Sequence, residues 1–128
     1  MHCCMNGIEY DTSKIGLEAV LRAWQLKALQ VLWRSPEGAK SVIVWEKVNK
    51  MLDRESISRA SIINFLEAMR EMSILSGVEA TGKGGYHWVY SPAMDEAGFK
   101  QFIAETLLQK IMSEFPEETR EAIKILSH

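Results

Sequence analysis

The stretch of residues 58–92 constrains the fold most, because its apolar pattern changes from a helical period to a strand period. Residues 58–72 carry apolar side chains at helical spacing, so one face of a helix can be buried: Ile62, Phe65, Leu66, Met69 and Met72. Residues 74–81 and 86–90 are rich in β-branched and aromatic side chains and are joined by Gly82-Lys83-Gly84-Gly85. Glycines tolerate the positive φ of a tight turn, so this region predicts a helix and then a two-stranded hairpin.

Local signals set the ends of these elements. Ser56 or Ser58 can cap the helix by accepting a hydrogen bond from a first-turn N–H, and Ser73 and Gly77 mark the break after it. Pro92 lacks a backbone donor and ends the second strand. A helix followed by a glycine-tipped hairpin is the order expected of a winged helix, a mostly α-helical α+β fold.

Two earlier helices are expected. Apolar residues recur on a broad face over residues 13–34 and predict one long helix, with Gly16 as a place where it can kink. The turn Ser35-Pro36-Glu37-Gly38 ends it. Ser41 can cap a second helix that ends around residues 53–55. Residues 40–72 therefore predict helix, short turn and helix, the arrangement that places the second helix in a DNA major groove.

The C-terminal residues predict two further helices. Asp95 and Glu96 favour a helix start, Pro116 breaks that helix, and residues 117–126 form a short last one. The first of the two has an apolar face wider than a monomer of this size needs, which includes Phe99, Phe102, Ile103, Leu107, Ile111 and Phe115. This helix either packs back on its own domain or forms a dimer, and we expect the dimer. The predicted organisation is a tail (1–13), a winged-helix domain (14–92) and a helical dimerisation segment (93–128).

Composition limits the classes of protein. The net charge of −2 is unevenly spread: residues 22–92 hold ten basic and seven acidic side chains, a net of +3, whereas residues 93–128 have a net of −3. The chain has no apolar run long enough for a membrane span and no secretion signal at its N-terminus, so we expect a cytoplasmic protein. His2-Cys3-Cys4 is half a metal site at most, and we expect neither a metal nor a cofactor.

An enzyme is not expected. The three histidines lie far apart, and neither a nucleophile-elbow nor a phosphate-loop motif is present. The alternating Tyr86, Trp88 and Tyr90 could stack on single-stranded bases, but such a stripe more often packs a hairpin, here against the first helix.

Four features together resemble the penicillinase-repressor family of winged-helix regulators, which includes the methicillin-resistance and copper-transport repressors. They are Leu26-x-x-Leu29-x-x-Leu32-Trp33, the helix over residues 42–52, the Ser58-x-x-Ser61-Ile62 helix, and the hairpin ending Tyr-x-Trp-Val-Tyr-Ser-Pro. The resemblance covers about residues 20–115. It implies a homodimer, formed through C-terminal helices, that binds a near-palindromic operator in double-stranded DNA as a repressor. Copper sensing is not implied, because residues 93–128 lack the paired cysteines of that branch.

The resemblance also implies which residues face the operator: Lys40, Ser41, Ser58, Arg59, Ala60, Ser61, Ile63, Asn64 and Lys83. Arginine can reach phosphate or guanine, asparagine can pair with adenine, and lysine can neutralise a phosphate. Ile63 and Ala68 depart from the family pattern, which tends to have polar or basic residues there, and Glu67 could bring a negative charge toward the phosphates. The alternative is a winged helix that binds a protein partner and no DNA.

Overall fold

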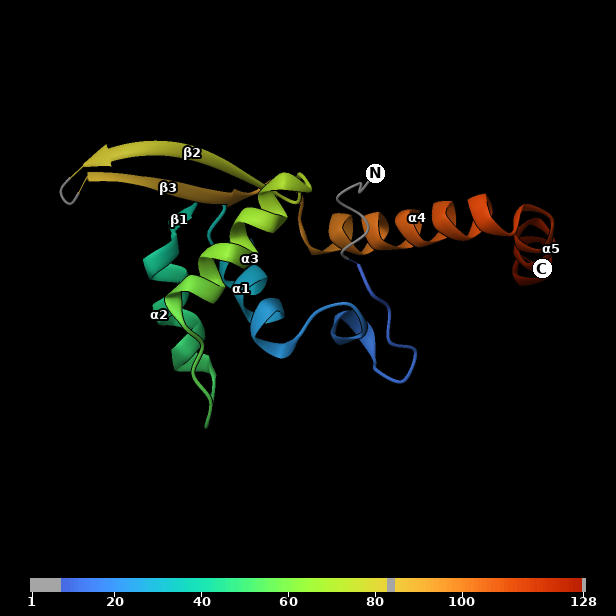
Figure 1. The fold of residues 1–128 in the computed structure, drawn as a ribbon, viewed down its shortest axis with the longest axis horizontal. Coiled ribbons are helices and arrows are strands. Elements are labelled where there is room, and N and C mark those ends of the chain that lie inside the picture. The colour runs from blue at the N-terminus through green and yellow to red at the C-terminus, as the bar shows by residue number, and fades with distance from the viewer. Residues whose placement is uncertain (1–7, 83–84, 128) are drawn as a thin grey trace. The chain divides into compact units, whose positions relative to one another are not determined.

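The structure is a computed structural model that describes residues 8–82 and 85–127. These residues form two compact units, one ending at Asp95 and the other beginning at Glu96, and each is considered separately. Figure 1 shows the elements of the first unit in chain order: η2 (Gly16–Ala19), α1 (Ala23–Trp33), β1 (Ala39–Lys40), α2 (Ser41–Met51), α3 (Arg59–Glu71), β2 (Leu75–Gly82) and β3 (Gly85–Pro92).

The prediction of one long first helix over residues 13–34 is wrong, although the helical segment is interrupted at Gly16, the place where a kink was expected. The segment contains a 3₁₀ turn, η2, and then α1, which begins only at Ala23. Gly16 has φ +64°, and Arg22 is extended with its backbone N–H donating to Gln25 Oε1 at 2.9 Å. A left-handed glycine and an extended residue cannot lie inside one continuous α-helix, so the apolar pattern is shared by two elements.

The next two helices lie close to their predicted places. Helix α2 begins at Ser41 itself, and Lys40 is its N-cap residue without a side-chain cap, so the predicted capping role of Ser41 is wrong. Helix α2 ends at Met51, before the predicted 53–55, because Leu52 is extended. Helix α3 runs over Arg59–Glu71 with Ser58 as its N-cap, as predicted, and Ser73 with φ +63° turns the chain after it.

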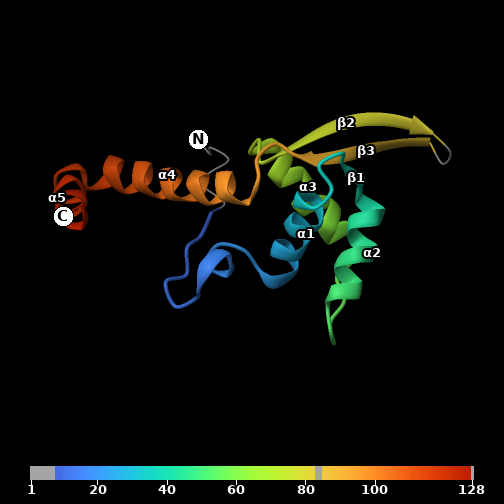
Figure 2. The same ribbon diagram turned by 180° about the vertical axis from the view of Figure 1, so that it is seen from behind.

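The hairpin is confirmed, and a third strand joins it. Strands β2 and β3 are antiparallel, with Gly77 opposite Tyr90, and the two-residue β1 pairs with the other edge of β3 in the order β1-β3-β2. Gly38, at φ +100°, precedes β1, and a Cβ there would lie 2.9 Å from the backbone oxygen of Tyr90. A glycine is therefore required for β1 to approach β3. Figure 2 shows the three helices α1, α2 and α3 beside this small sheet.

Apolar side chains from α1, α2, α3 and the start of β2 form the core of the first unit. The fully buried ones include Leu29, Leu32, Val44, Val48, Ile62, Leu66, Ile74 and Leu75. Because the buried residues of α3 all lie on one side, its opposite side is left outside the core. The result is a mostly helical α+β fold with a small antiparallel sheet, compatible with a winged helix.

The second unit consists of α4 (Glu96–Glu114) and α5 (Pro116–Leu126). Pro116 is the first residue of α5, so the predicted break lies where expected, and the side-chain hydroxyl of the buried Thr119 donates to the Ile111 backbone oxygen at 3.2 Å. This bond holds the start of α5 on the last turns of α4. None of the helices among the described residues has the length and apolar character needed to cross a membrane.

Candidate nucleic-acid interface

The first turn of α3 is closed by two serines. Ser58 Oγ accepts from the Ser61 backbone N–H at 3.1 Å and donates to Ser61 Oγ at 2.9 Å. This satisfies one of the free N–H groups that begin every helix. Arg59, the first residue of the helix, is exposed beside them. The serine pair therefore holds the backbone that presents Arg59.

Helix α2 fixes the residue that precedes this turn. The side chain of Asn49 accepts from the Ile57 N–H at 2.8 Å and donates to the Ile57 carbonyl at 3.2 Å. The indole N–H of Trp45 donates to the same carbonyl at 2.8 Å. Both polar groups of the Ile57 backbone are thus bound to α2, and the position of the α3 N-terminus depends on these bonds.

An open hollow of about 900 Å³ lies at this junction. Its lining consists of Trp45, Glu46, Asn49, Lys50, Ser56, Ile57 and Ser58. Lys50 is exposed and lines the same hollow as Ser58, so its side chain lies at the same end of α3 as Arg59. Lys50 was not among the residues predicted from the sequence. It could have been found from its position in the last turn of α2, because only a short loop separates that turn from Ser58.

The outward side of α3 carries few charges in its first half. Ala60, Asn64 and Ala68 are exposed and Ile63 is partly exposed. Residues three and four positions apart are neighbours on a helix, so Ala60, Ile63 and Asn64 form one patch. We call these three residues the outer patch of α3.

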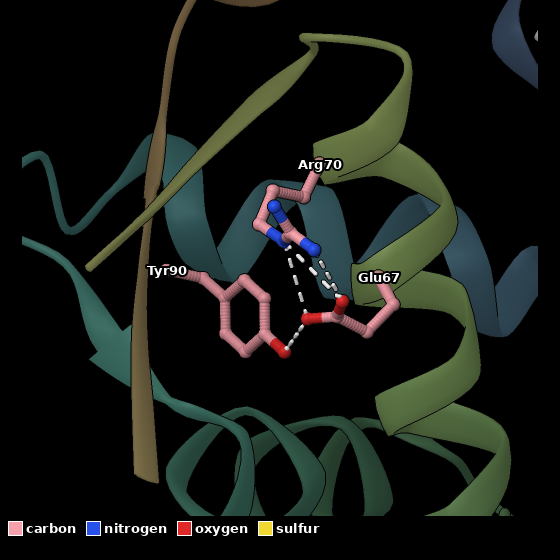
Figure 3. Close-up of polar contacts among 3 residues, drawn as sticks. All are labelled: Glu67, Arg70 and Tyr90. Carbon is pink, nitrogen blue, oxygen red and sulfur yellow. Dashed lines mark hydrogen bonds and ion pairs between the residues drawn. The ribbon is translucent and has the colours of Figure 1, made fainter. Parts of the chain in front are cut away.

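Glu67, the next residue after this patch on the same side, is turned toward the hairpin. Its carboxylate pairs with the Arg70 guanidinium at 2.7 Å and accepts from the Tyr90 hydroxyl of β3 at 2.5 Å (Figure 3). The hydrogen bonds from Arg70 and then Tyr90 lower the pKa of Glu67, whereas burial and the neighbouring carboxylate raise the pKa of Tyr90. The expected repulsion between Glu67 and phosphates is therefore reduced by its own cationic partner.

Arg70 also connects α3 to β3 through Trp88. Its guanidinium lies 4.7 Å from the centre of the Trp88 ring, a cation–π distance. Gly77 of β2 leaves the space for this contact, because a Cβ there would come within 2.5 Å of Arg70 Cδ. Gly77 thus lies within β2, and the prediction that it marks the break after α3 is wrong. The side chains of Trp88 and Tyr90 contact Arg70 and Glu67 of α3, and strand β3 also lies against α1, as predicted. The side chain of Tyr86 lies outside the described residues.

The predicted operator-facing residues form two groups. Ser58, Arg59, Ser61 and Asn64 lie together on the first turns of α3. Lys40 and Ser41 lie at the N-terminal end of the 11-residue α2, which is roughly 16 Å long, whereas Asn49 near its other end holds the residue before the α3 cap. Lys83 lies outside the described residues.

The predicted dimerisation residues differ in exposure. Phe99 and Ile103 are buried, at 1% and 7% exposed, and Phe102 and Leu107 are partly exposed. Ile111 and Phe115 are 44% and 59% exposed, and Leu108, which belongs to the same predicted apolar face, is 47% exposed. On α5, Ile123, Ile125 and Leu126 are exposed as well. The free apolar surface of the second unit is therefore concentrated from Leu108 onward.

No group of three or more potential metal ligands occurs within residues 8–82 and 85–127. The His2-Cys3-Cys4 segment lies outside these residues.

The Glu67 cluster makes stability depend on pH. The pKa of Glu67 is lowered, which means that the folded state favours the carboxylate over the neutral acid. The bonds of this carboxylate therefore stabilise the fold at pH values above 4.5, the ordinary pKa of a glutamate, and this stabilisation is lost as pH falls through the folded-state pKa. We expect Glu67→Gln to lower the free energy of unfolding by about 1 kcal/mol at neutral pH, and by less in acid. Urea unfolding at both pH values measures this, with the exposed Glu46→Gln as control. If Glu67→Gln lowers the free energy of unfolding in acid as much as at neutral pH, then the Glu67 carboxylate is not the source of the stabilisation.

Comparison with known proteins supports the fold. No known family profile matches the sequence. No curated protein matches it either. Among solved structures, the chain is similar to a protein from Methanosarcina mazei Go1 described as a possible transcriptional regulator, at 16% identity and a TM-score of 0.56. The match covers 79% of this chain and 78% of that one. At this identity the similarity establishes a shared fold and leaves the penicillinase-repressor resemblance as a sequence-based hypothesis.

Proposed function

We propose that this chain is a winged-helix transcriptional regulator that binds double-stranded DNA sequence-specifically and has no enzymatic activity. We further propose that it is a cytoplasmic repressor that acts as a homodimer on a near-palindromic operator. Support for a regulator comes from the described role of the similar M. mazei protein and from the resemblance of the sequence motifs. In this proposal α3 enters the major groove.

The observation that carries the proposal is the construction of the α3 N-terminus. Two bonds from Asn49 and one from Trp45 fix Ile57, Ser58 caps the helix, and Arg59 and Asn64 remain exposed. A rigid helix end that presents an arginine and an asparagine suits base reading in a groove. Lys50 beside it is placed to bind a flanking phosphate, and Lys83 is proposed as a phosphate contact on its charge alone.

The homodimer is proposed on the exposed apolar residues of the second unit. Leu108 and Ile111 lie one turn apart near the end of α4, Phe115 follows between α4 and α5, and all three are at least 44% exposed. A second copy of the same surface is the partner that a two-fold operator requires, since palindromic half-sites match two-fold protein symmetry. We place the interface there and not at Phe99 and Ile103, which are buried.

A protein-binding module is the second candidate. The absence of charged residues from the outer patch favours a protein partner, because two of the three patch residues, Ala60 and Ile63, are apolar. In that case the same face of α3 would contact a protein, and duplex DNA would not bind.

Replacement of the base-reading residues tests the proposal. We expect Arg59→Ala or Asn64→Ala to change the preference between DNA sequences by about 1–3 kcal/mol while the protein stays folded. Lys50→Ala should weaken all duplexes alike and reduce the salt slope by about one. Competition binding with a randomised duplex pool measures both effects. Unaltered preference in both α3 variants would remove α3 from the interface.

A further inference from the structure

We infer that the outer patch of α3 reads thymine methyl groups and adenine edges, so that each half-site contains A·T pairs at the contacted positions. This inference rests on the proposed function, since it names the class of sequence that the same site selects. It follows from the exposure of the patch and from the charges around it.

The patch offers two kinds of chemistry. Ala60 and Ile63 present methyl-bearing surface, and Asn64 presents one amide, with no charged group among the three. In the major groove, thymine has the only methyl group, and adenine offers the donor and acceptor pair that asparagine binds. Guanine, by contrast, offers two acceptors that suit arginine or lysine. The outer patch is therefore complementary to A·T pairs.

The cations near the patch lie at its edges. Arg70 is held on Glu67 and the Trp88 ring, and so is turned to the hairpin side of α3. Arg59 and Lys50 lie at the N-terminal end of the helix. Over residues 40–64, five basic side chains stand against three acidic ones, a net of +2. A neutral centre with positive surroundings suits a duplex, whose phosphates flank the base edges.

Removal of the thymine methyl groups tests this inference. A duplex selected from a randomised pool by the full-length protein is resynthesised with uracil in place of each thymine, which keeps base pairing and removes only the methyl. We expect the dissociation constant of the uracil duplex to rise about fourfold for each methyl in contact. The same pair of duplexes is then titrated with Ile63→Ala and with the milder Ile63→Val.

The variants assign the effect to the patch. The uracil penalty should fall in Ile63→Ala, fall less in Ile63→Val, and persist in Ile43→Ala, an isoleucine on α2 that is 38% exposed. An equal affinity of the wild-type protein for thymine and uracil duplexes overturns the inference, as does a penalty that is the same in all variants. Both results still include duplex binding, so they leave the proposed function standing. Absence of any duplex binding at low salt overturns both.

Discussion

Substitution of Ile111 and Phe115 by glutamate should convert the protein to monomers and weaken operator binding by roughly 10²- to 10⁴-fold. Both side chains are largely exposed within the second unit, at 44% and 59%, so the change should not remove core contacts. Charges on both sides of a two-fold interface repel, and a monomer can occupy only one half-site at a time.

Sedimentation and operator titration measure the two effects. Ile15→Glu is the matched control, because Ile15 is 90% exposed and lies outside the second unit. It should remain dimeric and bind normally. A double variant that stays dimeric would place the interface elsewhere, and a wild-type protein that is monomeric at working concentration would contradict the dimer itself.

Loss of the Asn49 side chain should have the largest effect of any polar substitution in the first unit. Asn49→Ala leaves the Ile57 N–H without its partner, and one such unpaired group costs about 1–3 kcal/mol where water cannot replace the bond, whereas the Ile57 carbonyl keeps its bond from Trp45. We expect urea unfolding to show a loss of about 2 kcal/mol. Because Ile57 positions the α3 start, the affinity for every duplex should also fall.

Asn64→Ala is the matched control for this experiment. Asn64 is an exposed asparagine on α3, so its removal should alter sequence preference and leave the free energy of unfolding within about 0.5 kcal/mol. If Asn49→Ala unfolds like the wild-type protein, then the bonds to Ile57 do not determine the turn between α2 and α3.

The ends of helices and strands were predicted correctly where one or two adjacent residues, such as a capping serine, a turn glycine or a proline, determine them. The Ser58 cap, the glycine connection of the hairpin and the Pro116 break each depend on one or two adjacent side chains, and the structure has helix or strand ends at these places. The first helix was mispredicted because an apolar pattern does not reveal a positive φ at Gly16 or the extended backbone of Arg22. Strand β1 was missed because two residues are too short to show a period.

The family resemblance implies that Ser58, Arg59, Ser61 and Asn64 face an operator, and the structure places these four residues at the start of α3. Their contact with DNA stays a prediction. The partners of Glu67 were not predicted, because the bond to Tyr90 spans 23 residues and depends on how the hairpin packs on α3. The binding of Ile57 by Asn49 likewise joins two elements, so only the tertiary structure reveals what holds the α3 N-terminus.

Fluorescence anisotropy with a labelled pool of random duplexes tests the central proposal, duplex binding, most directly. The protein is titrated at low and near-physiological salt, with single strands of the same pool as a control. The proposed function predicts duplex binding that weakens with salt, because cations at the interface release counterions from the phosphates, and predicts weaker binding to single strands. No duplex binding at low salt by a protein shown to be folded would contradict the proposed DNA-binding role and favour a protein partner for α3.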